Sequence, residues 1–73
     1  MPQEIVEVPL TGKILKVEVS VGDNVKEGDT LCILESMKME NPIVATVGGT
    51  ISKLNVKTDQ VVKTGDTIAV IEY

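Results

Sequence analysis

Apolar residues fall along the chain in short stretches that are separated by turn residues. Two of these stretches are unbroken, at residues 31–34 (Leu-Cys-Ile-Leu) and 68–71 (Ile-Ala-Val-Ile), which predicts strands buried on both faces. Further strands are expected at residues 5–8, 13–19, 42–47, 50–56 and 61–62, and around Val25. About eight short strands with turns between them are typical of a small all-β sandwich or barrel.

The strand pattern occurs twice. Residues 12–35 align with residues 49–72 at a constant offset of 37 positions, and ten of the 24 aligned pairs are identical. In both copies the apolar spacing changes from three to two within the first strand, at positions 14, 17 and 19 and at 51, 54 and 56, which predicts a β-bulge. Because stacked arrays need about three units, two copies predict halves related by a pseudo-two-fold axis. We expect a flattened barrel or sandwich of two four-stranded antiparallel sheets.

The turns are repeated as well. Gly28-Asp29 in the first copy is matched by Gly65-Asp66 in the second, with glycine placed where a positive φ is needed. Another turn, Gly22-Asp23, is matched by Asp59-Gln60, which lacks the glycine. Recurrence in both copies indicates that these aspartates serve the turns and not an acid–base site.

The composition agrees with this fold and limits its size. Val, Ile and Thr together supply 26 of the 73 residues, and such β-branched residues favour strands. The chain has no Phe or Trp and a single Tyr, so its core must be aliphatic. A chain of this length supports one domain, which we place at residues 1–73.

Several classes of function are excluded by what the chain lacks. With no His and one Cys, we expect no metal site and no Ser-His or Cys-His nucleophile pair, hence no catalytic residue. A net charge of −4 and one aromatic residue disfavour nucleic-acid binding. The longest apolar run has four residues, too short for membrane insertion, and no signal peptide is visible. The lone Cys32 is expected to be a buried hydrophobe in the reducing cytoplasm.

The most unusual residues lie at positions 36–41, between the two copies. This segment follows one buried strand and precedes another apolar stretch, so we expect a tight hairpin turn outside the repeat. Turns normally attract Gly, Asn, Asp or Pro, yet the tip reads Met37-Lys38-Met39. Apolar side chains on both sides of an exposed lysine indicate a surface that meets another molecule.

The run Glu35-Ser36-Met37-Lys38-Met39 resembles the attachment motif of biotinyl domains, in which the lysine between two methionines is the modified residue. The resemblance covers essentially the whole chain and includes its Gly-Asp turns. The sequence departs from the family pattern in strands and turns only, at Leu10-Thr11, Ser36, Thr46 and Asp59-Gln60.

The resemblance implies a flattened barrel with covalent biotin on Lys38 as cofactor. It also implies a biotin carboxyl carrier, not an enzyme by itself. A biotin protein ligase would attach the biotin, and carboxybiotin would then carry CO2 from a biotin carboxylase to a carboxyltransferase or decarboxylase subunit. Met37 and Met39 are expected to tune transfer or ligase recognition. Glu35 is expected to contact the ligase, although its counterpart Glu72 equally fits a structural role.

Two alternatives to biotin carriage remain open. A lipoyl carrier shares the fold and the hairpin lysine, but resemblance to that class requires an acidic residue before the lysine and a small one after it, where Met37 and Met39 stand. An unmodified β-barrel interaction module would keep Lys38 as a free amine.

Within the biotin family, the connection between the strands bears on the parent complex. Only five residues connect Val19 to Val25, too few for the protruding thumb of many acetyl-CoA carboxylase carriers. Acyl-CoA and oxo-acid carboxylases, transcarboxylases and decarboxylases all remain possible parents.

Overall fold

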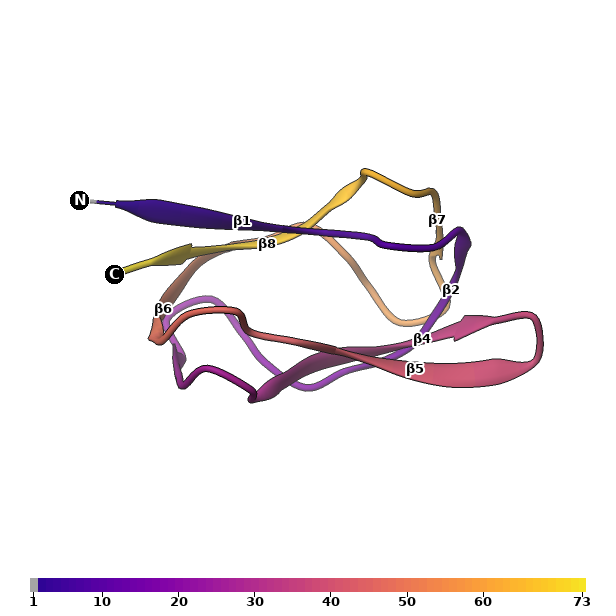
Figure 1. Cartoon of the computed structure of the whole chain (residues 1–73), viewed down its shortest axis with the longest axis horizontal. Coiled ribbons are helices and arrows are strands. Elements are labelled where there is room, and N and C mark those ends of the chain that lie inside the picture. Colours follow the sequence, from indigo (N-terminus) through magenta and orange to yellow (C-terminus); the bar gives the residue numbers. More distant parts are fainter. Residues whose placement is uncertain (1) are drawn as a thin grey trace.

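Eight short strands make up the regular structure of residues 2–73. The computed structural model describes residues 2–73, which form an elongated body measuring 36 × 18 × 17 Å (Figure 1). The strands are β1 (Gln3–Glu7), β2 (Gly12–Val17), β3 (Asn24–Val25), β4 (Thr30–Ser36), β5 (Met39–Val44), β6 (Gly49–Leu54), β7 (Val61–Val62) and β8 (Thr67–Glu72). The all-β prediction is confirmed. Residues 2–73 contain no helix long and apolar enough to cross a membrane.

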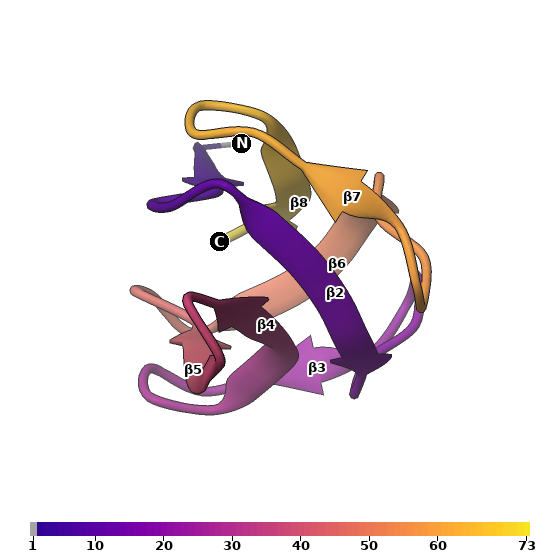
Figure 2. The ribbon, with the colours of Figure 1, turned by 90° about the vertical axis from the view of Figure 1, so that its right-hand side faces the viewer.

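The strands form two antiparallel four-stranded sheets, as the repeat predicted. One sheet has the order β1-β8-β6-β3 and the other β5-β4-β2-β7 (Figure 2). The offset of 37 positions converts each sheet into the other: β1 corresponds to β5, β2 to β6, β3 to β7 and β4 to β8. The predicted pseudo-two-fold relation is therefore present in the pairing of the strands.

The register breaks at the same place in each half. In the β2–β4 pair it shifts between Ile14 and Lys16, and in the β6–β8 pair it shifts between Ile51 and Lys53. These are the bulges that the change of apolar spacing predicts. A bulge bends its strand and increases the local twist, which helps two short sheets to close around one core.

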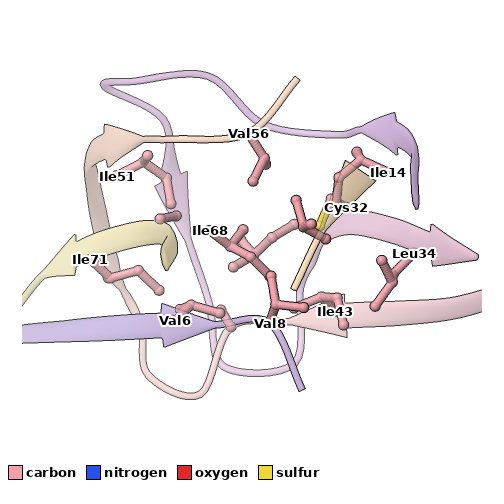
Figure 3. Close-up of a cluster of buried hydrophobic side chains, with 14 of the residues drawn as sticks. Val6, Val8, Ile14, Cys32, Leu34, Ile43, Ile51, Val56, Ile68 and Ile71 are labelled. Atoms are coloured by element: carbon pink, nitrogen blue, oxygen red, sulfur yellow. The ribbon is translucent and has the colours of Figure 1, made fainter. Parts of the chain in front are cut away.

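The core between the sheets is aliphatic. Both apolar runs contribute to it, and Leu34, Ile68 and Ile71 point into the cluster (Figure 3). These three residues and Leu31 are fully buried. Burial of such a side chain contributes about 1.5–3 kcal/mol. Cys32 is likewise buried within this cluster as a free thiol, as expected. Its burial raises the pKa of the thiol from 9.0 to about 11.

The repeated aspartates complete the turns. The Asp29 carboxylate accepts a hydrogen bond from the Lys26 backbone N–H at 2.8 Å, and Asp66 accepts one from Lys63 at 2.9 Å. Between them Gly28 and Gly65 adopt positive φ angles of 91° and 93°. The chain therefore uses both residues of each Gly-Asp pair, one for its backbone freedom and one for its acceptor oxygen.

The segment 36–41 is less irregular than we expected. Ser36 ends β4 and Met39 begins β5, so Glu40 and Asn41 are strand residues and the turn itself contains two residues. The prediction that this segment lies outside the repeat is wrong for its second half, because β5 is the counterpart of β1. The sequences of β1 and β5 have diverged, whereas the strand pairing that each makes is the same. Similarly, β2 ends at Val17 and not at Val19.

Candidate functional site

The candidate site is a two-residue turn at one end of the long axis. β4 and β5 form a hairpin that projects at this end, opposite both chain termini (Figure 1). Its last strand pair is Ser36 with Met39, so Met37 and Lys38 alone make the connection. Their φ angles are +53° and +64°. Positive φ at both central residues of a two-residue loop defines a type I′ turn, whose twist matches that of the flanking strands.

The residues of this turn are not the types that its backbone conformation favours. Type I′ turns favour Asn-Gly or Asp-Gly because a side chain is disfavoured in the left-handed region, where it costs roughly 1–2 kcal/mol per residue. Met37 and Lys38 adopt that region without the help of glycine or asparagine. The pairing of β4 with β5 imposes the turn, and strained backbone of this kind is concentrated at functional sites.

The side chains of the turn are turned toward solvent. Met37 is 92% exposed and Met39 is 66% exposed, so neither is part of the core. Lys38 is exposed between them and has no carboxylate within 4 Å among residues 2–73. The three sequence-predicted residues therefore form an uncovered tip, with a free amine flanked by two apolar thioethers.

The root of the hairpin is held by contacts within β5, to the β1–β2 connection and to β2. The Ser36 hydroxyl donates to the Thr11 carbonyl oxygen at 3.0 Å, and the Asn41 amide donates to the Met39 carbonyl oxygen at 3.2 Å. β2 passes so close that a Cβ placed on Gly12 would lie 2.2 Å from the Glu35 carbonyl oxygen. These contacts fix the strand ends from which Met37 and Lys38 extend.

Glu35 lies at this root and not at the tip. It is exposed, and its strand partners are Glu40 on one side and Lys13 on the other. The Lys13 ammonium pairs with Asp59 at 3.6 Å and not with Glu35. Glu72, the counterpart of Glu35 in the second copy, accepts a hydrogen bond from the Gln3 side chain at 3.1 Å. The two glutamates thus occupy equivalent backbone positions in different surroundings.

The hairpin tip is a protrusion and not a pocket. A hollow of about 450 Å³ opens elsewhere, beside β3, and is lined in part by Glu18, Asp23 and Asp29. Of its lining residues only Thr30 belongs to the hairpin, at the end of β4 remote from the turn. No group of three His, Cys, Asp or Glu side chains in residues 2–73 is placed to hold a metal ion. The chemistry available at the tip is therefore that of a solvent-exposed primary amine.

Comparison with known proteins identifies the family. The family model described as "Biotin-requiring enzyme" matches residues 3–71, nearly the whole chain. The chain belongs to this family. Membership confirms the resemblance carried by the Met-Lys-Met segment and by the repeated turns.

Individual relatives are similar over part of the chain or over nearly the whole fold. The biotin carboxyl carrier protein of Streptococcus mutans is 60% identical over 43 residues, which are 59% of this chain and 33% of that protein. The methylmalonyl-CoA decarboxylase subunit gamma of Veillonella parvula is 60% identical over 42 residues, 58% of this chain and 33% of that protein. The Kluyveromyces lactis urea carboxylase structure matches with a TM-score of 0.90 and 36% identity, covering 99% of this chain and 6% of that chain. The chain spans about a third of the length of these two curated relatives.

Sequence reasoning missed two features of the site. It did not predict that Met37 and Lys38 both have positive φ, nor that Ser36 and Thr11 are in contact. The first was predictable in part, because two-residue hairpin loops adopt type I′ or II′ turns, and both types have a positive φ at the first central residue. The second depends on how β4 passes the β1–β2 connection and has no local sequence signal.

Proposed function

We propose that this chain is a biotin carboxyl carrier domain, spanning residues 1–73, in which biotin is attached to Nζ of Lys38. The observation that carries the proposal is the position of Lys38. It is the exposed second residue of a strained two-residue turn, between two exposed methionines, in a member of the biotin-requiring family.

The residues of the tip fit the attachment of this cofactor. A neutral lysine amine can attack an activated biotin carboxyl group. The bond from nitrogen to the acyl carbon forms, the bond from that carbon to its activating group breaks, and the amine loses a proton to solvent. Biotin bound in this way supplies a ureido group that takes up and releases CO2. Lys38 is exposed and forms no ion pair within residues 2–73, so a ligase has direct access to its amine.

The remaining contribution of the domain is positioning. The paired strands of the hairpin hold the turn at the end of a 36 Å body, and the lysine stem with its biotin forms a flexible arm beyond it. Tethering of this kind raises the local concentration of the cofactor at a partner's active site to the order of millimolar. The domain then serves as a carrier, and the bond making and breaking belongs to its partners.

We infer the partners from the relatives. They include a carrier protein, a decarboxylase subunit and a carboxylase. The proposed partners are accordingly a biotin protein ligase, a biotin carboxylase, and a carboxyltransferase or decarboxylase subunit. A cytoplasmic location is part of the same proposal, and the buried free thiol of Cys32 supports it because that thiol needs no oxidising compartment.

We assign Met37 and Met39 to contacts with these partners and to tuning of transfer, because their exposure excludes a role in the core. Met→Leu changes at both positions conserve side-chain volume and should cost less than about 1.5 kcal/mol in folding. Slower carboxyl transfer with unchanged biotin attachment supports tuning, whereas the reverse pattern supports ligase recognition. Glu35, exposed at the hairpin root, is a third proposed ligase contact.

The proposal is tested by intact mass before and after incubation with biotin, ATP and a biotin protein ligase. A parallel sample receives lipoate and a lipoate ligase. One biotinyl increment in the first sample is the expected result. A lipoyl increment alone shows a lipoyl carrier, and no increment in either sample leaves an unmodified interaction module.

A further inference from the structure

We propose that Ser36 is a positioning residue, whose hydroxyl fixes the direction in which the hairpin presents Lys38. Ser36 is the last residue of β4, two positions before Lys38. Its hydroxyl donates to the backbone carbonyl of Thr11, at the end of the β1–β2 connection, across 3.0 Å. The kinetic consequences of this inference rest on the proposed carrier function. The contact between Ser36 and Thr11 is independent of that function.

Thr11 extends the contact to a third segment of the chain. Its own hydroxyl accepts a hydrogen bond from the Thr64 backbone N–H at 3.4 Å, in the turn between β7 and β8. The hairpin root, the β1–β2 connection and the β7–β8 turn are thereby linked through two hydrogen bonds. We call these three residues, Ser36, Thr11 and Thr64, the hydroxyl link.

The other end of the molecule shows that the fold does not require this link. An offset of 37 positions places Tyr73 at the counterpart of Ser36 and Gly48 at the counterpart of Thr11. There the strand ends are joined by a backbone bond from the Tyr73 N–H to the Pro2 carbonyl oxygen at 3.1 Å. Glycine has no hydroxyl with which to continue a link. The hydroxyl link is therefore an addition at the end that carries the lysine.

The link acts on the part of the hairpin that has the fewest other restraints. Beyond the Lys13–Glu35 pair no other strand in residues 2–73 pairs with the hairpin, so Met37 and Lys38 are oriented through Ser36 and Met39. Catalysis between bound partners is sensitive to such orientation, since a misplacement of about 1 Å can cost 10²-fold in rate. Loss of the Ser36 hydroxyl should therefore widen the range of directions of Lys38 and leave the docking surface unchanged.

The test compares three variants of the whole chain. Ser36→Ala removes the donor, and Ser36→Thr restores a hydroxyl at the same position. Ser52→Ala is the matched control, because the Ser52 hydroxyl also donates to a backbone carbonyl, that of Val70 at 3.2 Å, but lies in β6 away from the hairpin. Each protein is measured by ¹⁵N relaxation at residues 37 and 38, and by the kcat and KM of biotinylation by a biotin protein ligase.

We expect Ser36→Ala to lower the order parameters of Met37 and Lys38 from the rigid value of about 0.85 toward 0.6. It should also lower kcat by about three- to tenfold with little change in KM, because docking is intact and only the fraction of well-aligned amine falls. Ser36→Thr should restore both quantities, and Ser52→Ala should change neither.

Three results overturn the inference. The first is wild-type order parameters in Ser36→Ala, and the second is an equal loss in Ser52→Ala. The third is a Ser36→Ala variant with a more mobile turn and an unchanged kcat of biotinylation. That result would show that the Ser36 hydroxyl restrains the turn without affecting how Lys38 is presented to the ligase. If even the wild-type chain is not biotinylated, the carrier function fails together with the kinetic role of Ser36. In that case the order parameters still decide whether the hydroxyl link orders the turn.

Discussion

The two ends of the molecule share one backbone arrangement and differ in what closes it. At one end Met37 and Lys38 join β4 to β5. At the other end Tyr73 follows β8 and Pro2 precedes β1, and these two residues are joined by a hydrogen bond between backbone groups. The scaffold thus supplies two nearly equivalent positions, of which one carries the lysine. The candidate site is created by two turn residues and their supporting contacts, and not by the fold as such.

The same comparison separates structural from functional requirements. Features present at both ends, such as the bulges, the Gly-Asp turns and Gly12 with Gly49, serve the fold. Features present only at the hairpin end, such as the two left-handed residues of the turn and the hydroxyl link, serve presentation of Lys38. Substitutions at matched positions can test this division.

The largest effect on stability is expected at the glycines next to the strand ends. A Cβ on Gly12 would lie 2.2 Å from the Glu35 carbonyl oxygen, and one on Gly49 would lie 2.2 Å from that of Glu72. Gly12→Ala and Gly49→Ala should each destabilise the fold by about 3 kcal/mol in urea unfolding, because backbone must move. In the folded fraction only Gly12→Ala should slow biotinylation. Equal slowing by both variants would contradict the division between the two ends.

The next largest effect on stability is expected at Cys32. Both Cys32 and its counterpart Ala69 are buried. Burial raises the pKa of the Cys32 thiol from 9.0 to about 11, so the unfolded chain ionises more readily than the folded one. The stability due to the neutral thiol is complete below pH 9 and is lost as the pH rises to 11, by roughly 2–3 kcal/mol. Urea unfolding of wild type and Cys32→Ala from pH 7 to 11 should show a steeper loss in the wild type. Parallel curves would show that the thiol does not contribute.

A substitution that relieves the backbone strain of the hairpin turn should stabilise the fold. Asparagine tolerates the left-handed region better than methionine, so Met37→Asn should stabilise the fold by about 0.5–1 kcal/mol and slow carboxyl transfer. Met39→Asn is the control, because Met39 is a strand residue and not among those with positive φ. It should give no gain in thermal unfolding. A loss of stability in Met37→Asn would show that the turn is not strained.

The smallest effect is expected where the two repeats use different residues for one turn. Gly22 has a φ of +95° and its counterpart Asp59 has a φ of +70°. Asp59→Gly should relieve the backbone strain at this position. It would also remove the exposed ion pair with Lys13, which contributes little to stability. We expect a net gain of about 0.5 kcal/mol in thermal unfolding. A clear loss would show that the Lys13–Asp59 pair outweighs the backbone.

Much of the fold follows from the sequence because the chain repeats itself. The offset of 37 positions, the shifted apolar spacing at Ile14 and Ile51, and the recurring Gly-Asp turns together predict two equivalent sheets, which the structure has. Lys38 could be proposed as the site because Met37 and Met39 are residue types that turns do not favour and that exposed contact surfaces contain. Its backbone conformation and its link to Thr11 were not predicted. The first is set by the pairing of β4 with β5 and the second by tertiary contact, and neither is encoded in local residue preference.

The central claim is that Lys38, alone among seven lysines, carries the cofactor. It is tested most directly by biotinylating wild type, Lys38→Arg and Lys63→Arg in parallel and measuring their intact masses. Lys63 is a matched control because it too is an exposed lysine at a turn. We expect one biotinyl increment in wild type and Lys63→Arg and none in Lys38→Arg, with the same fold by circular dichroism, because guanidinium is a poor nucleophile. A biotinyl increment on Lys38→Arg would contradict the account.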